Sequence, residues 1–313
     1  MQPFRHTFRT MGCPAGICVY AASRKAAELA FRLARNEVQR LDRKYSHYRE
    51  DSGLADMLRQ ASRPEGIAPD GETAALLNFA DLQFRESGGR FDITAGRLSA
   101  LWDRATGLPT PAELNRAVDC TGWQRVGWDG ERLRVPPGTK LDLGGMVKEY
   151  AADRAALLLK SAGVASGYVD LGGDLHVLGP HPDGGAWRIG IRHPRAAGAM
   201  ARIGMSRGGL ATSGDYERCS LIGGRRYGHI IDPRSGWPVQ GLASVSVAAQ
   251  SCLIAGAVST LAMLQDRHEG LNLLRSSGLA WLAHDGDFSF SGEAGMLPPC
   301  QATIAIPRKE FAA

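Results

Sequence analysis

The sequence lacks the features of a membrane protein or a disulfide-stapled protein. It has no run of about 18 apolar residues, so it contains no candidate membrane span. The first residues, MQPFRHTFRTMG, lack the apolar stretch of a signal peptide, which predicts a cytoplasmic protein, or a periplasmic one if a leader has been removed. The six cysteines are far apart and form no CxxC pair, which argues against a zinc cluster, a thioredoxin-type motif and a disulfide framework.

Strong charge is also missing. The formal net charge is +5, and the lysines and arginines are scattered without a basic block. Such a balance is typical of an ordinary solvated surface, so nucleic-acid binding is not predicted, although a modest positive field suits a phosphorylated ligand. With 313 residues, 44% of them hydrophobic, the chain is long enough to bury a core as one large domain or two smaller ones.

Hydrophobic spacing predicts helices interleaved with short strands. Helices are expected over residues 24–42, 72–86, 254–263 and, after a turn at 141–145, up to residue 159. Strands are expected at residues 16–22, 167–171, 176–178, 187–191, 280–284 and 302–306. The order has no βαβα rhythm, and neither a fixed-period repeat nor a low-complexity linker divides the chain, so an α+β fold is predicted rather than a doubly wound α/β fold.

Residues that can carry chemistry gather in four short clusters. In the first, residues 88–96 (GGRFDITAG), glycines let backbone amides approach a ligand, but Asp92 and Thr94 suit a cap of the next element equally well. In the second, residues 141–150 (LDLGGMVKEY), a Gly-Gly turn opens onto a helix with Lys148 in its first turn, which is a reasonable phosphate cradle. A solvent-facing lysine on an ordinary helix is the alternative, and the Walker A pattern is absent.

The other two clusters are equally open when taken alone. Residues 170–174 (DLGGD) place two carboxylates around a Gly-Gly turn, which can bind a cation or simply form a tight turn. Residues 211–216 (ATSGDY), followed by residues 229–233 (HIIDP), supply a hydroxyl, a carboxylate and a histidine, which together can transfer protons. The Asp-Pro pair after His229 predicts that this histidine lies near an exposed loop.

In their order along the chain, the clusters resemble the ApbE family, the FAD:protein FMN transferases. Each motif is weak by itself, but the shared order covers roughly residues 10 to 280. The matching residues are Met11-Gly12, Ser46-His47-Tyr48, Asp51-Ser52, 91–94, 101–102, 142–145, Lys148, Tyr150, Asp153, 171–174, Trp187, 212–216, 229–233 and 259–260.

The resemblance implies both a fold and a reaction. The fold is a single α+β, ApbE-like (T-fold-like) domain over residues 1–313, with a flavin cleft between two lobes. The reaction is Mg²⁺-dependent cleavage of the FAD pyrophosphate, transfer of FMN to a Thr or Ser hydroxyl of a flavoprotein acceptor that bears an acceptor motif, and release of AMP. Slow hydrolysis of FAD to FMN and AMP, and FAD binding without cleavage, are the alternatives within the family.

The resemblance also implies roles for individual residues. His229 is the candidate general base and Lys148 the catalytic cation at the phosphates. The main-chain carbonyl of Gly145 and the hydroxyl of Thr260 match metal ligands. The expected FAD contacts are Met11, Tyr48, Phe91, Asp92, Thr94, Asp142, Lys148, Ser213 and Ile231.

Two positions depart from the family pattern at the metal site. Gly256 stands where the family has a metal-binding Asp, which predicts weakened Mg²⁺ binding, because this hard cation prefers carboxylate oxygen. Glu149 follows Lys148 where the family usually has glycine. Adjacent helix residues point about 100° apart, so Glu149 is expected to be a surface substitution that faces away from the site rather than a replacement ligand.

One further segment resembles the acceptor motif itself. Residues 70–76 (DGETAAL) place an Asp before Thr73, which would permit self-flavinylation of Thr73. The same residues suit the start of a helix, and the helix start is the prediction.

Overall fold

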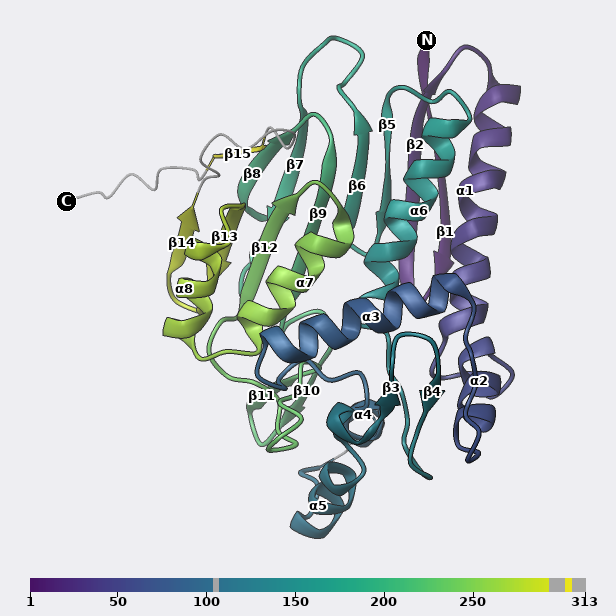
Figure 1. Ribbon diagram of the computed structural model, residues 1–313. Helices are drawn as coiled ribbons and strands as arrows, with labels where there is room; N and C mark the ends of the chain where they lie inside the picture. Colours follow the sequence, from purple (N-terminus) through teal and green to yellow (C-terminus); the bar gives the residue numbers. More distant parts are fainter. Residues whose placement is uncertain (104–106, 293–301, 306–313) are drawn as a thin grey trace, which may run out of the picture.

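The computed structural model describes residues 1–103, 107–292 and 302–305, and its centre is an eight-stranded antiparallel sheet. The strand order is β1-β2-β5-β6-β9-β12-β13-β14, so segments far apart in the chain lie side by side (Figure 1). In that order, the strands span Gln2–Thr10, Cys13–Ala21, Gly167–Leu171, Asp174–Gly179, Gly208–Gly214, Ser244–Ala249, Ala280–His284 and Ser289–Gly292.

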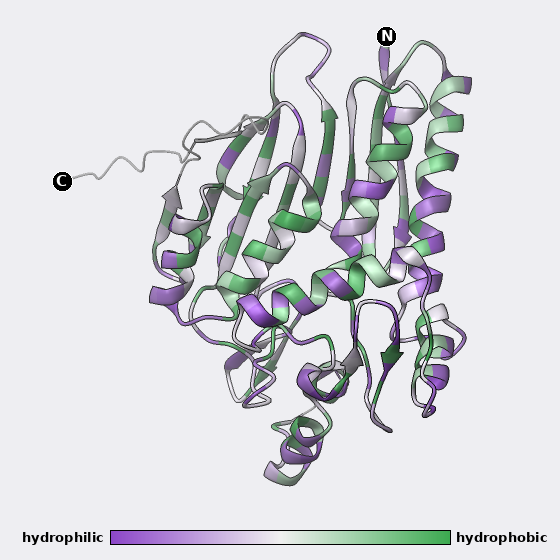
Figure 2. Ribbon diagram, viewed as in Figure 1, coloured by the Kyte–Doolittle hydropathy of each residue, from purple (hydrophilic) through white to green (hydrophobic). Residues whose placement is uncertain are grey.

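Helices cover one face of this sheet (Figure 1). Helix α1 (Arg24–Tyr45) packs beside α6 (Val147–Ser161), which lies over β5 and β6, while α7 (Cys252–Met263) lies over β9 and β12 and is followed by α8 (Arg267–Ser276). Four fully buried alanines of α6 allow close packing, because their side chains are small: Ala151, Ala152, Ala155 and Ala156. Figure 2 shows hydrophobic residues through α7 and hydrophilic ones along the outer side of α1.

The other face of the sheet is covered by a second, smaller sheet. Its order is β15-β8-β7, with bounds Ala302–Ala305, Ala199–Met205 and Trp187–Arg192. Ile191, Ile203 and Met205 of this sheet pack against Val177 and Leu282 of the main sheet. Because β6 and β12 are covered on both faces, they are buried along their whole length instead of alternating.

The remaining elements lie at the lower end of the main sheet in Figure 1. They comprise four helices, a 3-10 turn η1 and two short hairpins among the described residues. Their bounds are α2 Gly53–Ala61, α3 Gly71–Glu86, α4 Gly96–Asp103, α5 Pro111–Asp119, η1 Trp123–Arg125, β3 Gly127–Trp128, β4 Leu133–Arg134, β10 Cys219–Ile222 and β11 Arg225–Gly228. The start of α6 faces this region, so residues 141–150, the second of the four clusters, lie next to it.

The predicted α+β class is confirmed, and the predicted helices and strands are present. The expected helices correspond to α1, α3, α6 and α7, and the expected strands to β2, β5, β6, β7, β13 and β15. The two-carboxylate cluster is the hairpin turn between β5 and β6, where Gly172 and Gly173 have φ values of 66° and 96°, so the turn interpretation is correct. Assignment of all 313 residues to one domain stays a prediction.

The segment that resembles an acceptor motif is a helix start, as predicted. Asp70 caps α3 and accepts a hydrogen bond from the Thr73 amide at 2.9 Å. The Thr73 side chain is buried and lies 3.0 Å from the Tyr45 hydroxyl. Its hydroxyl is therefore not presented to solvent. Among the described helices, none has the length and hydrophobicity needed to cross a bilayer.

Candidate active site

Lys148, in the first turn of α6, is held in place by a buried carboxylate. It forms an ion pair with Asp174, the first residue of β6. Asp174 is buried and also accepts a hydrogen bond from the Thr212 amide of β9 at 3.0 Å. The Lys148 side chain is 26% exposed, so the alternative of a solvent-facing lysine on an ordinary helix is wrong. Because Asp174 begins β6, the ammonium group lies at that end of the strand, and Lys148 follows the Gly-Gly turn by three residues.

The Gly-Gly turn ahead of α6 is anchored on one side and open on the other. The leucines on either side of Asp142 are fully buried, whereas Gly144 and Gly145 are exposed. The Asp142 amide donates to the Ile93 carbonyl at 2.7 Å, and the Asp142 carboxylate accepts the Gly144 amide at 2.8 Å. Exposed backbone without side chains is what a phosphate group can approach closely.

Asp142 is also paired with a histidine that follows α1. His47 Nδ1 lies 2.9 Å from Asp142 Oδ1. Burial raises the pKa of Asp142, but the hydrogen bond and charge of His47 and the amide of Gly144 outweigh it, so this pKa lies below its ordinary value. An anionic carboxylate repels phosphate, so Asp142 is better suited to holding the turn and His47 than to touching phosphate directly. The expected FAD contact at Asp142 stays a prediction.

An exposed aromatic ring stands next to this pair. Tyr48 is 63% exposed, and its ring lies against that of His47, with 3.8 Å between the centroids. The Tyr48 hydroxyl donates to Asp103 at the end of α4 at 3.0 Å and accepts a hydrogen bond from Arg218 at 2.9 Å. Tyr48 is therefore fixed at its hydroxyl while its ring stays open to solvent, as a stacking surface for a flat ligand ring requires.

His229 follows β11 and is neutral at physiological pH. Burial and then the charge of Arg218 lower its pKa to about 4. Its Nδ1 lies 3.2 Å from the Arg218 carbonyl. A carbonyl can only accept, so Nδ1 carries the proton and Nε2 keeps a free lone pair. His229 therefore has the tautomer that a general base needs.

A cluster of hydroxyl groups lies where α7 packs on β9. Ser213 Oγ is 2.8 Å from Ser259 Oγ and 3.0 Å from Thr260 Oγ1. Ser259 also donates to the Gly256 carbonyl at 3.0 Å. The structure thus brings two predicted site residues, Ser213 and Thr260, into direct contact. Their expected ligands, FAD for Ser213 and a metal ion for Thr260, stay predictions.

Glu149 does not lie on the surface, contrary to the sequence expectation. Its residue is only 7% exposed, and its side chain fills the space beside Gly256 on α7. A Cβ atom added to Gly256 would lie 2.6 Å from Glu149 Cγ and 3.1 Å from Glu149 Oε1. The expectation failed because α6 is covered on two sides: Lys148 points toward the sheet, and Glu149, about 100° around the helix, points toward α7.

Phe91, Asp92 and Thr94 form the wall opposite the Gly-Gly turn. The Phe91 ring is buried and lies 3.4 Å from the Cβ position of Gly145. Asp92 accepts hydrogen bonds from both the amide and the hydroxyl of Thr94, at 2.7 and 2.6 Å, and from the Trp123 amide at 2.9 Å. These bonds fasten the segment to η1. Asp92 and Thr94 therefore have the structural role that the sequence offered as the alternative to ligand contact. FAD contact by Phe91, Asp92 and Thr94 stays a prediction.

Met11 and Ile231 are the two remaining predicted FAD contacts. Met11 occupies the β1–β2 turn with φ of 48°, the only non-glycine residue in the described part of the chain with a left-handed backbone, and its amide donates to Asp42 at 3.0 Å. Such a strained conformation is found often at functional sites. Ile231 is buried against Trp102 and Tyr227. Both contacts stay predictions.

Two further residues at the site carried no separate signal in the sequence. Arg218 joins Tyr48 to His229, through its guanidinium and its carbonyl respectively. The sequence marks Asp174 only as part of a Gly-Gly turn, whereas in the structure it is the partner of Lys148. His47 could have been found, because it stands inside the Ser-His-Tyr motif that carried part of the family resemblance.

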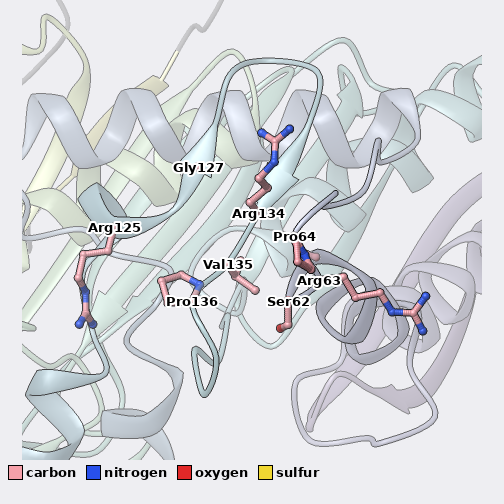
Figure 3. A pocket seen from close by; sticks show the side chains of 9 residues that line it. Ser62, Arg63, Pro64, Arg125, Gly127, Arg134, Val135 and Pro136 are labelled. Atoms are coloured by element: carbon pink, nitrogen blue, oxygen red, sulfur yellow. The ribbon is translucent and has the colours of Figure 1, made fainter.

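A surface hollow of about 300 Å³ lies away from these residues. It is lined by residues 61–64, 125, 127 and 134–136, and it contains Arg63, Arg125 and Arg134. Figure 3 shows the three guanidinium groups pointing in different directions. Because they diverge, they cannot grip one phosphate together, and none of the predicted site residues lines this hollow.

The sequence is similar to proteins of the ApbE family. The chain matches the sequence model described as the ApbE family over residues 11–283. It is 30% identical over 274 residues to the FAD:protein FMN transferase of Salmonella typhimurium, covering 82% of this chain and 77% of that protein. It is 32% identical over 235 residues to the FAD:protein FMN transferase of Vibrio cholerae, covering 72% of this chain and 70% of that protein.

Solved structures agree with this match. The ApbE protein of Thermotoga maritima superposes with a TM-score of 0.83 at 30% identity, covering 93% of this chain and 97% of that one. The flavin transferase ApbE of Vibrio cholerae gives a TM-score of 0.80 at 27% identity, covering 94% and 98%. The described fold is therefore shared with these proteins over nearly its whole length.

Proposed function

The chain belongs to the ApbE family, and on that premise we propose that it is an FAD:protein FMN transferase. It cleaves the FAD pyrophosphate, attaches FMN to a Thr or Ser hydroxyl of an acceptor protein that bears an acceptor motif, and releases AMP. The observation that carries the proposal is the fixed Lys148 beside the exposed Gly-Gly turn at the start of α6. Its cationic group and the open backbone suit a diphosphate.

The proposed reaction needs a base for the acceptor hydroxyl. As the hydroxyl oxygen attacks the phosphorus on the FMN side, the bond from that phosphorus to the bridging oxygen breaks and AMP leaves with the electron pair. The hydroxyl proton passes to Nε2 of His229, which is unprotonated because its pKa is about 4. The negative charge of a bound diphosphate stabilises the imidazolium that results, so His229 becomes a better base once FAD is bound.

The flavin end of the ligand is assigned to Tyr48. Its exposed ring, fixed by Asp103 and Arg218 at the hydroxyl, offers a face for the isoalloxazine. Lys148 and the Gly144–Gly145 backbone take the diphosphate. The acceptor hydroxyl enters between the diphosphate and His229.

We also infer that Mg²⁺ takes part. When bound, it offsets the charge that builds on the pyrophosphate oxygens. The Gly145 carbonyl and the Thr260 hydroxyl are hard oxygen donors that fit this cation. The donor set also needs a carboxylate, and Gly256 offers none.

The alternative of an FAD-binding protein with weak or no transferase activity depended on a site without a carboxylate. The Glu149 carboxylate lies directly against Gly256, so the missing side chain at position 256 does not by itself favour this alternative. The pyrophosphatase alternative differs only in the acceptor, which would be water. No feature of the described residues favours it over transfer to a protein hydroxyl.

Incubation of the full chain with FAD, Mg²⁺ and an acceptor domain tests the proposal. Flavin fluorescence that stays on the acceptor after denaturing electrophoresis is the expected result. Lys148→Met should abolish it, whereas Lys160→Met, at the exposed far end of the same helix, should not. Intact FAD after prolonged incubation with the wild-type chain would refute the proposal.

A further inference from the structure

We propose that Glu149 is the carboxylate ligand of the divalent cation in this chain, supplied by α6 because position 256 on α7 has no side chain. The inference rests on the proposed function for the presence of the cation. It concerns which residue of this chain holds the ion. The Glu149 carboxylate is buried, lies between α6 and α7, and has no partner for one of its oxygens.

The first observation is that Glu149 is buried without a partner for one of its oxygens. In the described part of the chain, Glu149 Oε2 is fully covered and makes no hydrogen bond. No Lys, Arg or His of the described residues forms an ion pair with Glu149, and the adjacent Lys148 is committed to Asp174. Burying a carboxylate is costly unless a cation or donors compensate it. A missing positive partner is therefore expected at Oε2.

The second observation is that the surroundings add negative charge. Asp153 follows Glu149 by one helical turn and faces the same helix, α7. Burial, followed by the charges of Asp153 and then Glu149, raises the pKa of the Cys252 thiol well above its usual value. Cys252 precedes Gly256 by one turn of α7. The nearby cationic groups already have other partners, since Lys148 pairs with Asp174 and His176 lies against Asp153, so neither is the counter-ion of Glu149.

The third observation is that the two helices are locked together at this contact. Asp153 accepts the amides of Cys252 and Leu253 at 2.7 and 2.9 Å and lies 2.6 Å from His176 Nδ1. These bonds fix the first turn of α7 against α6. The bonds of Asp153 hold α6 and α7 at a fixed distance. The Glu149 side chain therefore stays against Gly256.

The fourth observation is that other oxygen donors lie close along the chain to Glu149 and to Gly256. Gly145 lies in the turn directly before α6, four residues ahead of Glu149, and Thr260 follows Gly256 by one turn of α7. The Thr260 hydroxyl lies in the cluster with Ser213. A carboxylate, a hydroxyl and a carbonyl leave coordination positions for phosphate oxygens and water, which is how Mg²⁺ is usually held.

Manganese binding tests the inference without reference to turnover. Mn²⁺ replaces Mg²⁺ and is counted by electron paramagnetic resonance as the signal of the free ion is lost on titration. The wild-type chain, with FAD present, should bind Mn²⁺, and Glu149→Gln should weaken it by at least about tenfold. Glu131→Gln, an exposed acid in a surface loop, is the matched control and should bind like the wild type.

A second variant moves the carboxylate to the neighbouring helix. The double substitution Glu149→Gly with Gly256→Asp should restore Mn²⁺ binding lost in Glu149→Gly, because the Asp side chain enters the space that Glu149 has left. As a separate readout, Mg²⁺ should raise the melting temperature of the wild type and of the double variant but not that of Glu149→Gln.

The outcomes separate this inference from the proposed function. Glu149→Gln that binds Mn²⁺ as tightly as the wild type overturns the inference alone, provided that FAD still binds. A wild-type chain that takes up no Mn²⁺, with or without FAD, overturns it too. A wild-type chain that leaves flavin fluorescence unchanged in an FAD titration refutes the proposed function instead.

Discussion

Replacing Gly256 by alanine should destabilise the protein, although alanine is the better helix former. In the interior of α7 the change to alanine alone would stabilise by about 1 kcal/mol. The new Cβ would lie 2.6 Å from Glu149 Cγ, a distance at which the glutamate must move. Overpacking of a filled site costs about 1–3 kcal/mol. The clash outweighs the propensity, and the expected net loss in the free energy of unfolding is about 0–2 kcal/mol.

The sign of the effect should reverse once Glu149 is shortened. In a Glu149→Ala background the clash is gone, so Gly256→Ala should stabilise by about 1 kcal/mol. Urea unfolding of the four variants of this cycle measures both changes from the transition midpoints. Gly71→Ala, at the first position of α3 with no atom near its Cβ position, is the control for a glycine-to-alanine change without a clash. Equal effects of Gly256→Ala in both backgrounds would mean that Glu149 and residue 256 do not touch, and would refute the reasoning.

Three other predictions concern the site. Lys148→Met should leave buried Asp174 without its cation and lower the free energy of unfolding, measured in urea, by about 1–3 kcal/mol. Adding Asp174→Asn to this variant should recover part of the lost stability. His229→Gln should lower kcat by about 10²–10⁴. In the wild type, the stability that neutral His229 contributes is complete above pH 6.5 and is lost as pH falls toward 4, because its pKa is lowered to about 4. The free energy of unfolding of the variant, measured against pH, should lack this loss. Tyr48→Ala should weaken FAD binding by about 1–3 kcal/mol in a fluorescence titration, whereas Tyr48→Phe, which keeps the ring, should lose less; an unchanged Kd for Tyr48→Ala would contradict the stacking assignment.

Local patterns in the sequence predicted the parts of the fold that depend on local structure. The apolar spacing of α1 and the β5–β6 turn are properties of short segments, so both were found. Many other elements were not predicted, among them the strands β1, β8, β9 and β12 and the helices α2, α5 and α8. Strands buried on both faces lose the alternation that marks a strand, and β12 is an example.

The site was predictable as a set of motifs but not as a geometry. The order of the motifs identified Lys148, Tyr48 and His229 as candidates. The direction of Glu149 could not be read from its neighbours, because it depends on α7, which follows about a hundred residues later and is tied to α6 by Asp153. Arg218 likewise reaches Tyr48 only through the folding of the loop after β9.

The most direct test of the central claim is the ratio of products in one sample. The full chain is incubated with FAD, Mg²⁺ and an acceptor domain, AMP is measured by chromatography, and acceptor-bound FMN is measured by intact mass. Phosphoester transfer to a protein hydroxyl predicts one AMP for each FMN attached. AMP accompanied by free FMN and an unmodified acceptor would contradict the account.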